Sequence, residues 1–112
     1  PGLRTGPTLV EGPLTLDPTS RNAELYGERL PLARREFCLL EQLLRKSGRV
    51  VPRNLLEQAI YSFDDEVGPN ALEAAVSRLR KVLEGAGAPL TVVTIRGVGW
   101  MLAPVREPPG TS

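Results

Sequence analysis

A two-faced helix pattern at residues 69–83, PNALEAAVSRLRKVL, constrains the fold of this chain more than any other segment. At about 100° per residue, one narrow stripe holds the apolar side chains of Leu72, Val76, Leu79 and Leu83. The opposite side carries Asn70, Ala74, Ser77, Arg78 and Lys81, with Arg80 on its flank. Such a helix buries one side and presents the other to a partner. Because an α-helix fits the major groove of DNA, where Arg can hold guanine and Asn can hold adenine, the pattern predicts a recognition helix.

Charge is distributed unevenly along the chain, although the net charge is only +1. Residues 29–53 carry seven basic and two acidic groups, whereas residues 54–77 carry five acidic groups and no basic one. If residues 29–53 fold beside residues 78–96, their basic groups form one face that suits a nucleic acid. Two plainer alternatives are that these charges are ordinary solvated surface, and that the cations of residues 78–81 complement the negative end of a helix dipole.

The length of 112 residues fits one domain, and 41% apolar with 24% charged residues is typical of a soluble globular protein. No apolar run approaches the roughly 20 residues that a membrane span requires. The single cysteine, Cys38, excludes an internal disulfide, and without a signal-peptide pattern the chain is expected in a reducing cytoplasm. The chain does not begin with Met, which suggests a fragment of a longer protein.

Turn signals divide the chain into a linker remnant at residues 1–7, a folded domain at residues 8–102 and a flexible Pro-rich tail at residues 103–112. Within the first part of the domain, three turns predict an antiparallel meander of four short strands near residues 8–11, 13–17, 21–25 and 29–32. Its expected inward residues are Leu9, Leu14, Leu16, Leu25 and Leu30.

Two more helices and a hairpin complete the predicted domain. A helix at residues 33–46 places Phe37, Leu40 and Leu44 on one stripe, and Ser47-Gly48 ends it. A shorter helix near residues 52–60 offers Leu55, Leu56, Ala59 and Ile60 for burial. Residues 90–102 predict a β-hairpin around the turn Gly97-Val98-Gly99, with Arg96 beside it. Three helices followed by this hairpin predict an α+β winged helix-turn-helix, in which the third helix reads one groove and the wing reaches the next.

Three features that could carry other chemistry have plainer interpretations. Cys38 has no histidine to activate it, because the chain contains none, and is expected to pack in or near the core. The acids Asp64, Asp65 and Glu66 lack the surrounding pattern of a calcium loop, so a solvated loop or protein contact is favoured and no metal site is expected. The sequence RGVGW lacks the third glycine and the lysine of a phosphate-binding loop. Neither an enzyme nor a cofactor is therefore predicted.

Residues 8–102 resemble the OmpR/PhoB-type effector domains of bacterial two-component response regulators. The resemblance is carried by PLARREFCLLEQLLRKSGRVVPRNLLEQAIY, NALEAAVSRLRKVLE and VVTIRGVGWML, in the order and approximate spacing of that family. It implies an N-terminal four-stranded antiparallel sheet, three helices and a C-terminal hairpin wing. The implied function is sequence-specific binding of double-stranded DNA in transcription regulation.

The same resemblance implies roles for individual residues. Bases are read by the positions matching Asn70, Ala74 and Arg78. DNA phosphates or the minor groove are contacted by the positions matching Arg53, Tyr61, Ser77, Arg80, Thr94 and Arg96, and the helix-wheel argument adds Lys81. Arg53 is also favoured on physical grounds, because a cation in the opening turn of a helix opposes the dipole and suits an outward role. Asp64, Asp65 and Glu66 match a segment that family members present to RNA polymerase.

Four positions depart from the usual family pattern. Ala33 replaces a threonine, so the first helix lacks a hydroxyl N-cap that contributes roughly 1 kcal/mol. Ala75 replaces a histidine, and the small Ala74 and Ala75 are expected to leave room for close approach to DNA. Tyr61 and Trp100 stand where tryptophan and tyrosine are usual, which weakens the case for a phosphate contact at Trp100.

The partners implied are promoter DNA in direct repeats bound by a tandem dimer, and RNA polymerase. The chain is expected to be a monomer when it is not bound to DNA and to work at the nucleoid in the cytoplasm. It is also expected to lack the upstream receiver domain, whose phosphorylation switches dimeric DNA binding in members of the family. Two rival interpretations are a winged helix that binds an acidic protein and a small hydrolase using Cys38 or the acidic run. The hydrolase has no supporting motif.

Overall fold

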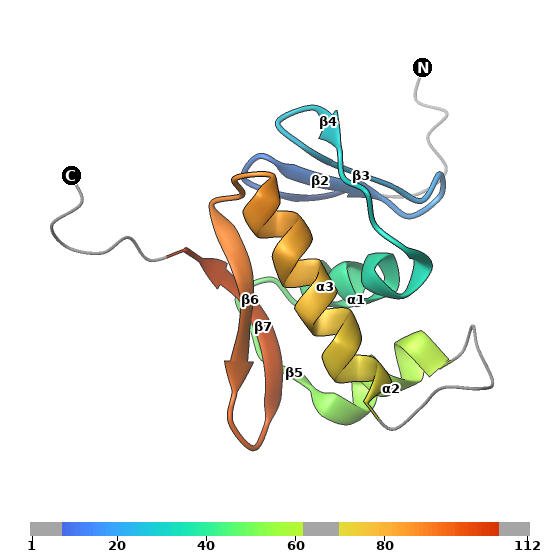
Figure 1. The fold of residues 1–112 in the computed structure, drawn as a ribbon, viewed down its shortest axis with the longest axis vertical. Coiled ribbons are helices and arrows are strands. Elements are labelled where there is room, and N and C mark those ends of the chain that lie inside the picture. Colours follow the sequence, from blue (N-terminus) through green and yellow to red (C-terminus); the bar gives the residue numbers. More distant parts are fainter. Residues whose placement is uncertain (1–7, 62–69, 106–112) are drawn as a thin grey trace, which may run out of the picture.

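The computed structural model describes residues 8–61 and 70–105, which form two antiparallel sheets and three helices (Figure 1). The first sheet has the order β1-β2-β3-β4, with strands Leu9–Glu11, Leu14–Asp17, Asn22–Leu25 and Glu28–Arg29. The helices are α1 (Arg34–Arg45), α2 (Arg53–Tyr61) and α3 (Ala71–Gly85). The second sheet has the order β5-β7-β6, with strands Val51–Pro52, Gly99–Pro104 and Leu90–Ile95. This architecture confirms the predicted α+β winged-helix class.

The N-terminal meander packs one face on the helices because its apolar residues alternate. Leu14 pairs with Leu25 and Leu16 with Ala23, and all four side chains are buried. The β3–β4 turn at Tyr26-Gly27 has φ values of 52° and 83°, the two positive angles of a tight type I′ hairpin. The last predicted strand, 29–32, is wrong in its bounds: β4 contains only Glu28–Arg29, and the buried Leu30 follows it. Leu9 is only partly buried.

Helix α1 begins without a hydroxyl cap, as the sequence predicted, but a glutamate compensates in part. The Ala33 N–H donates to Glu36 Oε1 at 2.9 Å, which satisfies a backbone donor at the helix start. Glu36 is only 4% exposed, so this charged side chain lies within the packed end of α1. The predicted stripe of Phe37, Leu40 and Leu44 is buried.

The wing sheet contains a strand that the sequence did not predict. β5 pairs with β7, so that Val51 lies opposite Trp100 and Pro52 opposite Gly99, and β7 becomes the central strand. A Cβ atom on Gly99 would lie 1.9 Å from the Val51 carbonyl oxygen, so only glycine permits this approach. β7 also continues through Pro104, which corrects the start of the tail expected at residues 103–112, because Ala103 pairs with Thr91.

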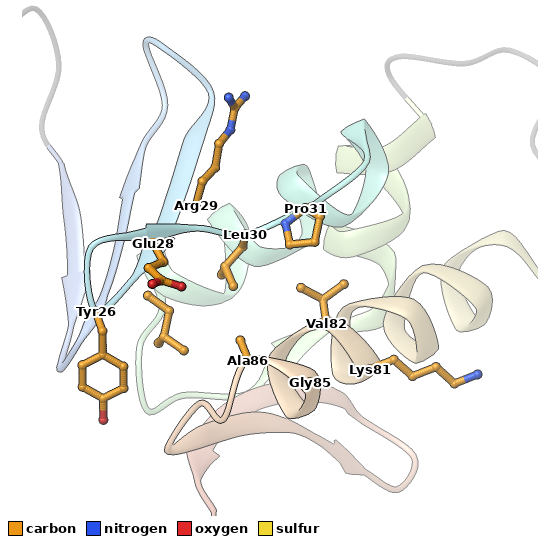
Figure 2. Close-up of a pocket in the computed structure, with 10 residues that line it drawn as sticks. Tyr26, Glu28, Arg29, Leu30, Pro31, Lys81, Val82, Gly85 and Ala86 are labelled. Atoms are coloured by element: carbon orange, nitrogen blue, oxygen red, sulfur yellow. The ribbon is translucent and has the colours of Figure 1, made fainter.

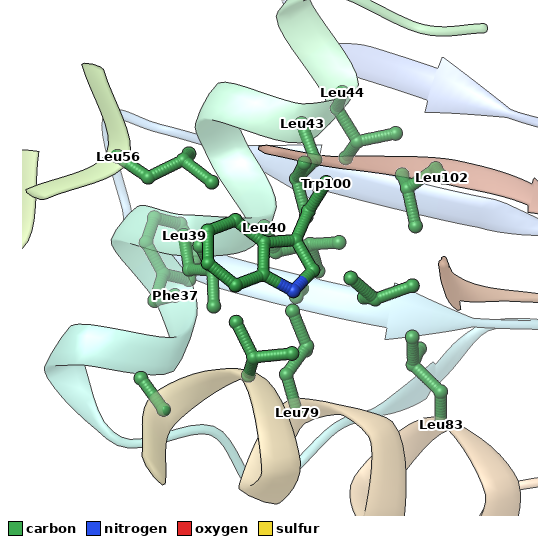
Figure 3. Packing of buried hydrophobic residues seen from close by; sticks show 14 of the residues in the cluster. Phe37, Leu39, Leu40, Leu43, Leu44, Leu56, Leu79, Leu83, Trp100 and Leu102 are labelled. Atoms are coloured by element: carbon green, nitrogen blue, oxygen red, sulfur yellow. The ribbon is translucent and has the colours of Figure 1, made fainter. Parts of the chain in front are cut away.

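One hydrophobic core joins both sheets and all three helices, and Trp100 lies inside it (Figure 3). The indole is 6% exposed and packs among leucines of α1 and α3, which makes it mainly a core residue. In α2, Leu56 and Ile60 are fully buried as predicted, but Leu55 is 39% exposed, which corrects its expected burial. Within the described part of the chain, no helix has both the length and the apolar character needed to cross a membrane.

Candidate nucleic-acid interface

Helix α3 separates its apolar and polar residues as the sequence pattern requires. The buried stripe is Leu72, Val76, Leu79 and Leu83. Asn70, Ser77, Arg78 and Lys81 are exposed, and Ala74 is half-buried. The helix extends from Ala71 to Gly85, two residues beyond the predicted end, while Pro69 lies outside the described residues. The face proposed to contact DNA is therefore accessible over its whole described length.

Asn70 and Ala75 differ in their suitability for contact. Asn70 occupies the N-cap position, where its carbonyl accepts from the Ala74 N–H at 2.9 Å, and its side-chain amide makes no capping bond. Asn70 is also exposed to solvent. Ala75 is 1% exposed and belongs to the core, so the expectation that it leaves room for close approach to DNA is wrong, whereas Ala74 is half-buried on the polar side of α3.

Arg80 ties α3 to the wing. Its Nε donates to the Val92 carbonyl oxygen at 2.8 Å, and its Nη2 donates to the Thr94 hydroxyl at 2.8 Å. Arg80 is half-buried, whereas Thr94 is exposed on β6. The family resemblance implies a phosphate contact for each of these two residues, and the structure joins them in one hydrogen-bonded unit.

Arg53 lies where α2, α3 and the wing meet. Its Nε donates to Glu57 Oε2 at 3.0 Å, its Nη2 forms an ion pair with Glu73, and its guanidinium carbon lies 5.5 Å from the centroid of the Trp100 ring. The backbone N–H of Arg53 donates to the Val98 carbonyl oxygen at 3.2 Å. Arg53 is thus the first residue of α2, attached to the turn of the wing by its backbone and to the recognition helix by its side chain.

The ion pair affects the protonation equilibria of both partners. The hydrogen bond with Glu73 raises the pKa of Arg53 above its ordinary value, and the same bond lowers the pKa of the Glu73 carboxyl. Both groups are therefore charged at neutral pH. The sequence analysis missed both acidic partners. The spacing of Arg53 and Glu57, four residues apart on a helix, was the one available signal.

A small cavity of about 250 Å³ opens between the start of α2 and the wing. Its lining residues are Arg53, Thr94, Ile95, Gly97, Val98, Gly99 and Trp100. Two of the predicted phosphate contacts, Arg53 and Thr94, thus border the same hollow. Arg96 lies in the turn between β6 and β7 and is exposed.

A larger groove of about 680 Å³ lies between the β3–β4 segment and the C-terminal end of α3 (Figure 2). Lys81 borders this groove from α3, and its ammonium points away from the hollow, while the exposed ring of Tyr26 lies at the opposite rim. Lys81 therefore borders a different hollow from the one that Arg53 and Thr94 share.

The remaining predicted residues fall into three groups. Tyr61 ends α2 and packs partly against the core. Asp64, Asp65 and Glu66 lie outside the described residues. Cys38 is 8% exposed, and burial raises the pKa of its thiol, so it remains protonated at neutral pH and packs as the sequence predicted.

Residues 27–102 match the family described as "Transcriptional regulatory protein, C terminal". The chain belongs to this family. The probable transcriptional regulatory protein y4xI of Sinorhizobium fredii is 49% identical over 98 residues, which cover 88% of this chain and 43% of that protein. The response regulator protein PmrA of Pseudomonas aeruginosa is 43% identical over 97 residues, which cover 87% of this chain and 42% of that protein. The chain thus spans less than half the length of these curated relatives.

Solved structures agree with the family match. The DNA-binding domain of Klebsiella pneumoniae RstA, crystallised in complex with the RstA box, superposes with a TM-score of 0.72 at 31% identity and covers 89% of this chain and 100% of that chain. The predicted OmpR/PhoB-type family, the winged-helix fold and the class of response-regulator effector domain in transcription regulation are thereby confirmed. This is a family of transcription regulators and not of enzymes.

Proposed function

We propose that this domain binds double-stranded DNA sequence-specifically, with α3 in the major groove and the wing turn at the minor groove. The observation that carries the proposal is the position of the wing beside the exposed face of α3, fixed by the bonds from Arg80 to β6. A helix that enters the major groove while a second element reaches the neighbouring groove is a common arrangement for reading DNA. The complex of the similar RstA domain with its DNA box supports the proposal.

The contacts divide into base reading and phosphate binding. We assign base reading to Asn70, Ala74 and Arg78, because they share the exposed face of α3. We assign phosphate or minor-groove contacts to Arg53, Tyr61, Ser77, Arg80, Lys81, Thr94 and Arg96. Arg80 uses two of its five N–H donors on β6, so other donors are left for a phosphate.

Selection of bound duplexes from a random library tests the proposal. Sequence-specific binding predicts an enriched motif, and phosphate contacts predict that affinity for any duplex falls steeply with salt. Binding of a random duplex should be measured at two salt concentrations. The absence of measurable affinity at low salt would favour the rival in which the basic face of α3 docks on an acidic protein.

We further propose that the domain acts in a response regulator whose phosphorylated receiver domain lies outside this chain. On this proposal it works at the nucleoid in the cytoplasm, is a monomer off DNA and binds direct repeats as a tandem dimer. A repeat spaced near one helical turn in the selected motif supports tandem binding. Loss of transcription activation without loss of DNA binding, on neutralising Asp64, Asp65 and Glu66, supports a contact of that segment with RNA polymerase.

A further inference from the structure

We propose that Glu73 limits the DNA affinity of this domain. In the DNA-free protein, the Glu73 carboxylate binds the Arg53 guanidinium, which in the complex binds a phosphate of the DNA backbone instead. Glu73 lies on the exposed side of the first turn of α3, and its carboxylate is paired with Arg53 Nη2. The side chains of both residues are about half-exposed, at 44% for Arg53 and 47% for Glu73. A DNA phosphate that approaches Arg53 must therefore compete with a carboxylate that is already in place. This inference rests on the proposed DNA binding.

The two acidic partners of Arg53 do different work. Glu57 is on the same helix, four residues away, and receives Nε at 3.0 Å, while the Trp100 ring lies against one face of the guanidinium. These contacts orient the guanidinium group of Arg53. Glu73 reaches Arg53 from another helix and takes only Nη2. Exchange of Glu73 for a phosphate therefore leaves the anchoring of Arg53 by Glu57 and Trp100 intact.

The exchange of Glu73 for a phosphate at Arg53 costs little free energy, because the ion pair is exposed and the helix dipole also stabilises the Glu73 carboxylate. Exposed ion pairs contribute little to stability, since water screens them. In the first turn of α3, the carboxylate also faces the positive end of the helix dipole, which stabilises it after release. A phosphate gains a charge-assisted bond from Nη2 beside the small hollow that Arg53 and Thr94 line.

The test is the salt dependence of binding to a duplex of random sequence by this chain and by its Glu73→Gln variant. If a phosphate displaces Glu73 from Arg53, the complexes of both proteins neutralise the same number of phosphates, so the slope of log affinity against log salt is expected to stay the same. At low salt, the affinity of the variant is expected to be about two- to fivefold higher, the range that an exposed ion pair controls. Glu73→Ala, which has no side-chain acceptor, is expected to give the same rise in affinity.

A second mutation separates this mechanism from a general effect of removing negative charge. In an Arg53→Gln background, Glu73→Gln is expected to leave the low-salt affinity unchanged, because no ion pair with Arg53 remains to be broken. Glu84→Gln removes an exposed acid from the other end of the same helix and is expected to leave the low-salt affinity of the unaltered chain unchanged.

A rise in low-salt affinity that persists in the Arg53→Gln background, or an unchanged low-salt affinity for Glu73→Gln, overturns the inference. Both outcomes leave the proposed function standing, because they require the unaltered chain to bind DNA. Absence of duplex binding by the unaltered chain would instead reject the proposed function itself. Thermal unfolding of each variant establishes that the affinities are compared between folded proteins.

Discussion

Arg80 of α3 donates to the hydroxyl of Thr94 on β6, and a second bond from the same guanidinium reaches the Val92 carbonyl oxygen. The recognition helix and the wing are therefore connected by one side chain. Lysine could not reproduce the connection, because its ammonium lacks the planar fork that spans two acceptors. We expect this contact to help position the wing and Arg96 at its turn.

We expect Arg80→Ala to weaken the contribution of Arg96 to DNA binding. If Arg80 positions the wing, the effects of Arg80→Ala and Arg96→Ala are not additive, with a coupling energy of about 0.5 kcal/mol or more. Dissociation constants of the two single variants and the double variant measure it. Ser77→Ala combined with Arg96→Ala serves as a control and should be additive, since no bond links Ser77 to the wing in the described residues. Additive effects for Arg80 and Arg96 would identify them as independent phosphate contacts.

Arg78→Ala is expected to flatten base preference. Arg78 is exposed near the middle of the reading face of α3, and its loss should cost on the order of 1–3 kcal/mol at one base position. Comparing affinities for the selected motif and for single-base variants of it measures this effect. Lys81→Ala is the matched control, because loss of a phosphate contact weakens all duplexes alike. Uniform weakening by Arg78→Ala would show that Arg78 also contacts phosphate.

Gly99→Ala is expected to destabilise the domain by about 1–3 kcal/mol or more, since its Cβ would overlap the Val51 carbonyl oxygen and push β5 from β7. Urea unfolding measures the change. Gly85→Ala is the matched control, because no atom lies within 4 Å of the added Cβ and Gly85 ends a helix. That variant should be neutral or more stable by up to about 1 kcal/mol. Equal stability of the two variants would contradict the close approach at Gly99.

Cys38 is expected to contribute to loss of stability in alkaline solution. Burial raises the pKa of its thiol in the folded state, so the unfolded chain loses this proton first as pH rises. The contribution of Cys38 is complete below the ordinary thiol pKa, near 9, and is lost as pH rises toward the folded value. The difference in unfolding free energy between the chain and Cys38→Ala, measured by urea at pH 7 and pH 10, should shrink at the higher pH. A constant difference would show that the thiol is not desolvated.

Local patterns in the sequence predicted the elements, because helix faces and turn residues are set by neighbours in the chain. The buried stripe from Leu72 to Leu83 and the packing of Cys38 follow from such patterns. The strand β5 was not predicted, because its two residues, Val51 and Pro52, are too few to show a strand periodicity. They form a strand through their pairing with β7.

The partners of the candidate site depended on tertiary packing instead. The pair of Arg53 and Glu73 joins residues 20 positions apart, and no spacing rule connects them. The bond from Arg80 to the Val92 carbonyl involves a backbone atom, whose availability depends on sheet pairing and not on residue type. Exposure of Leu55 and burial of Ala75 likewise depend on how α2 and α3 are rotated against α1.

The central place of β7 in its sheet has a consequence for the DNA that the domain selects. β5 and β6 hold this strand on both sides, and Val98 in the turn is bonded to the first residue of α2. The wing is thus bonded to β5 and to the start of α2, so we expect its distance from α3 to change little when a duplex binds. We expect the duplex to bend or to narrow its groove to fit that distance, so preferred sites should include flexible base steps at positions that no side chain touches.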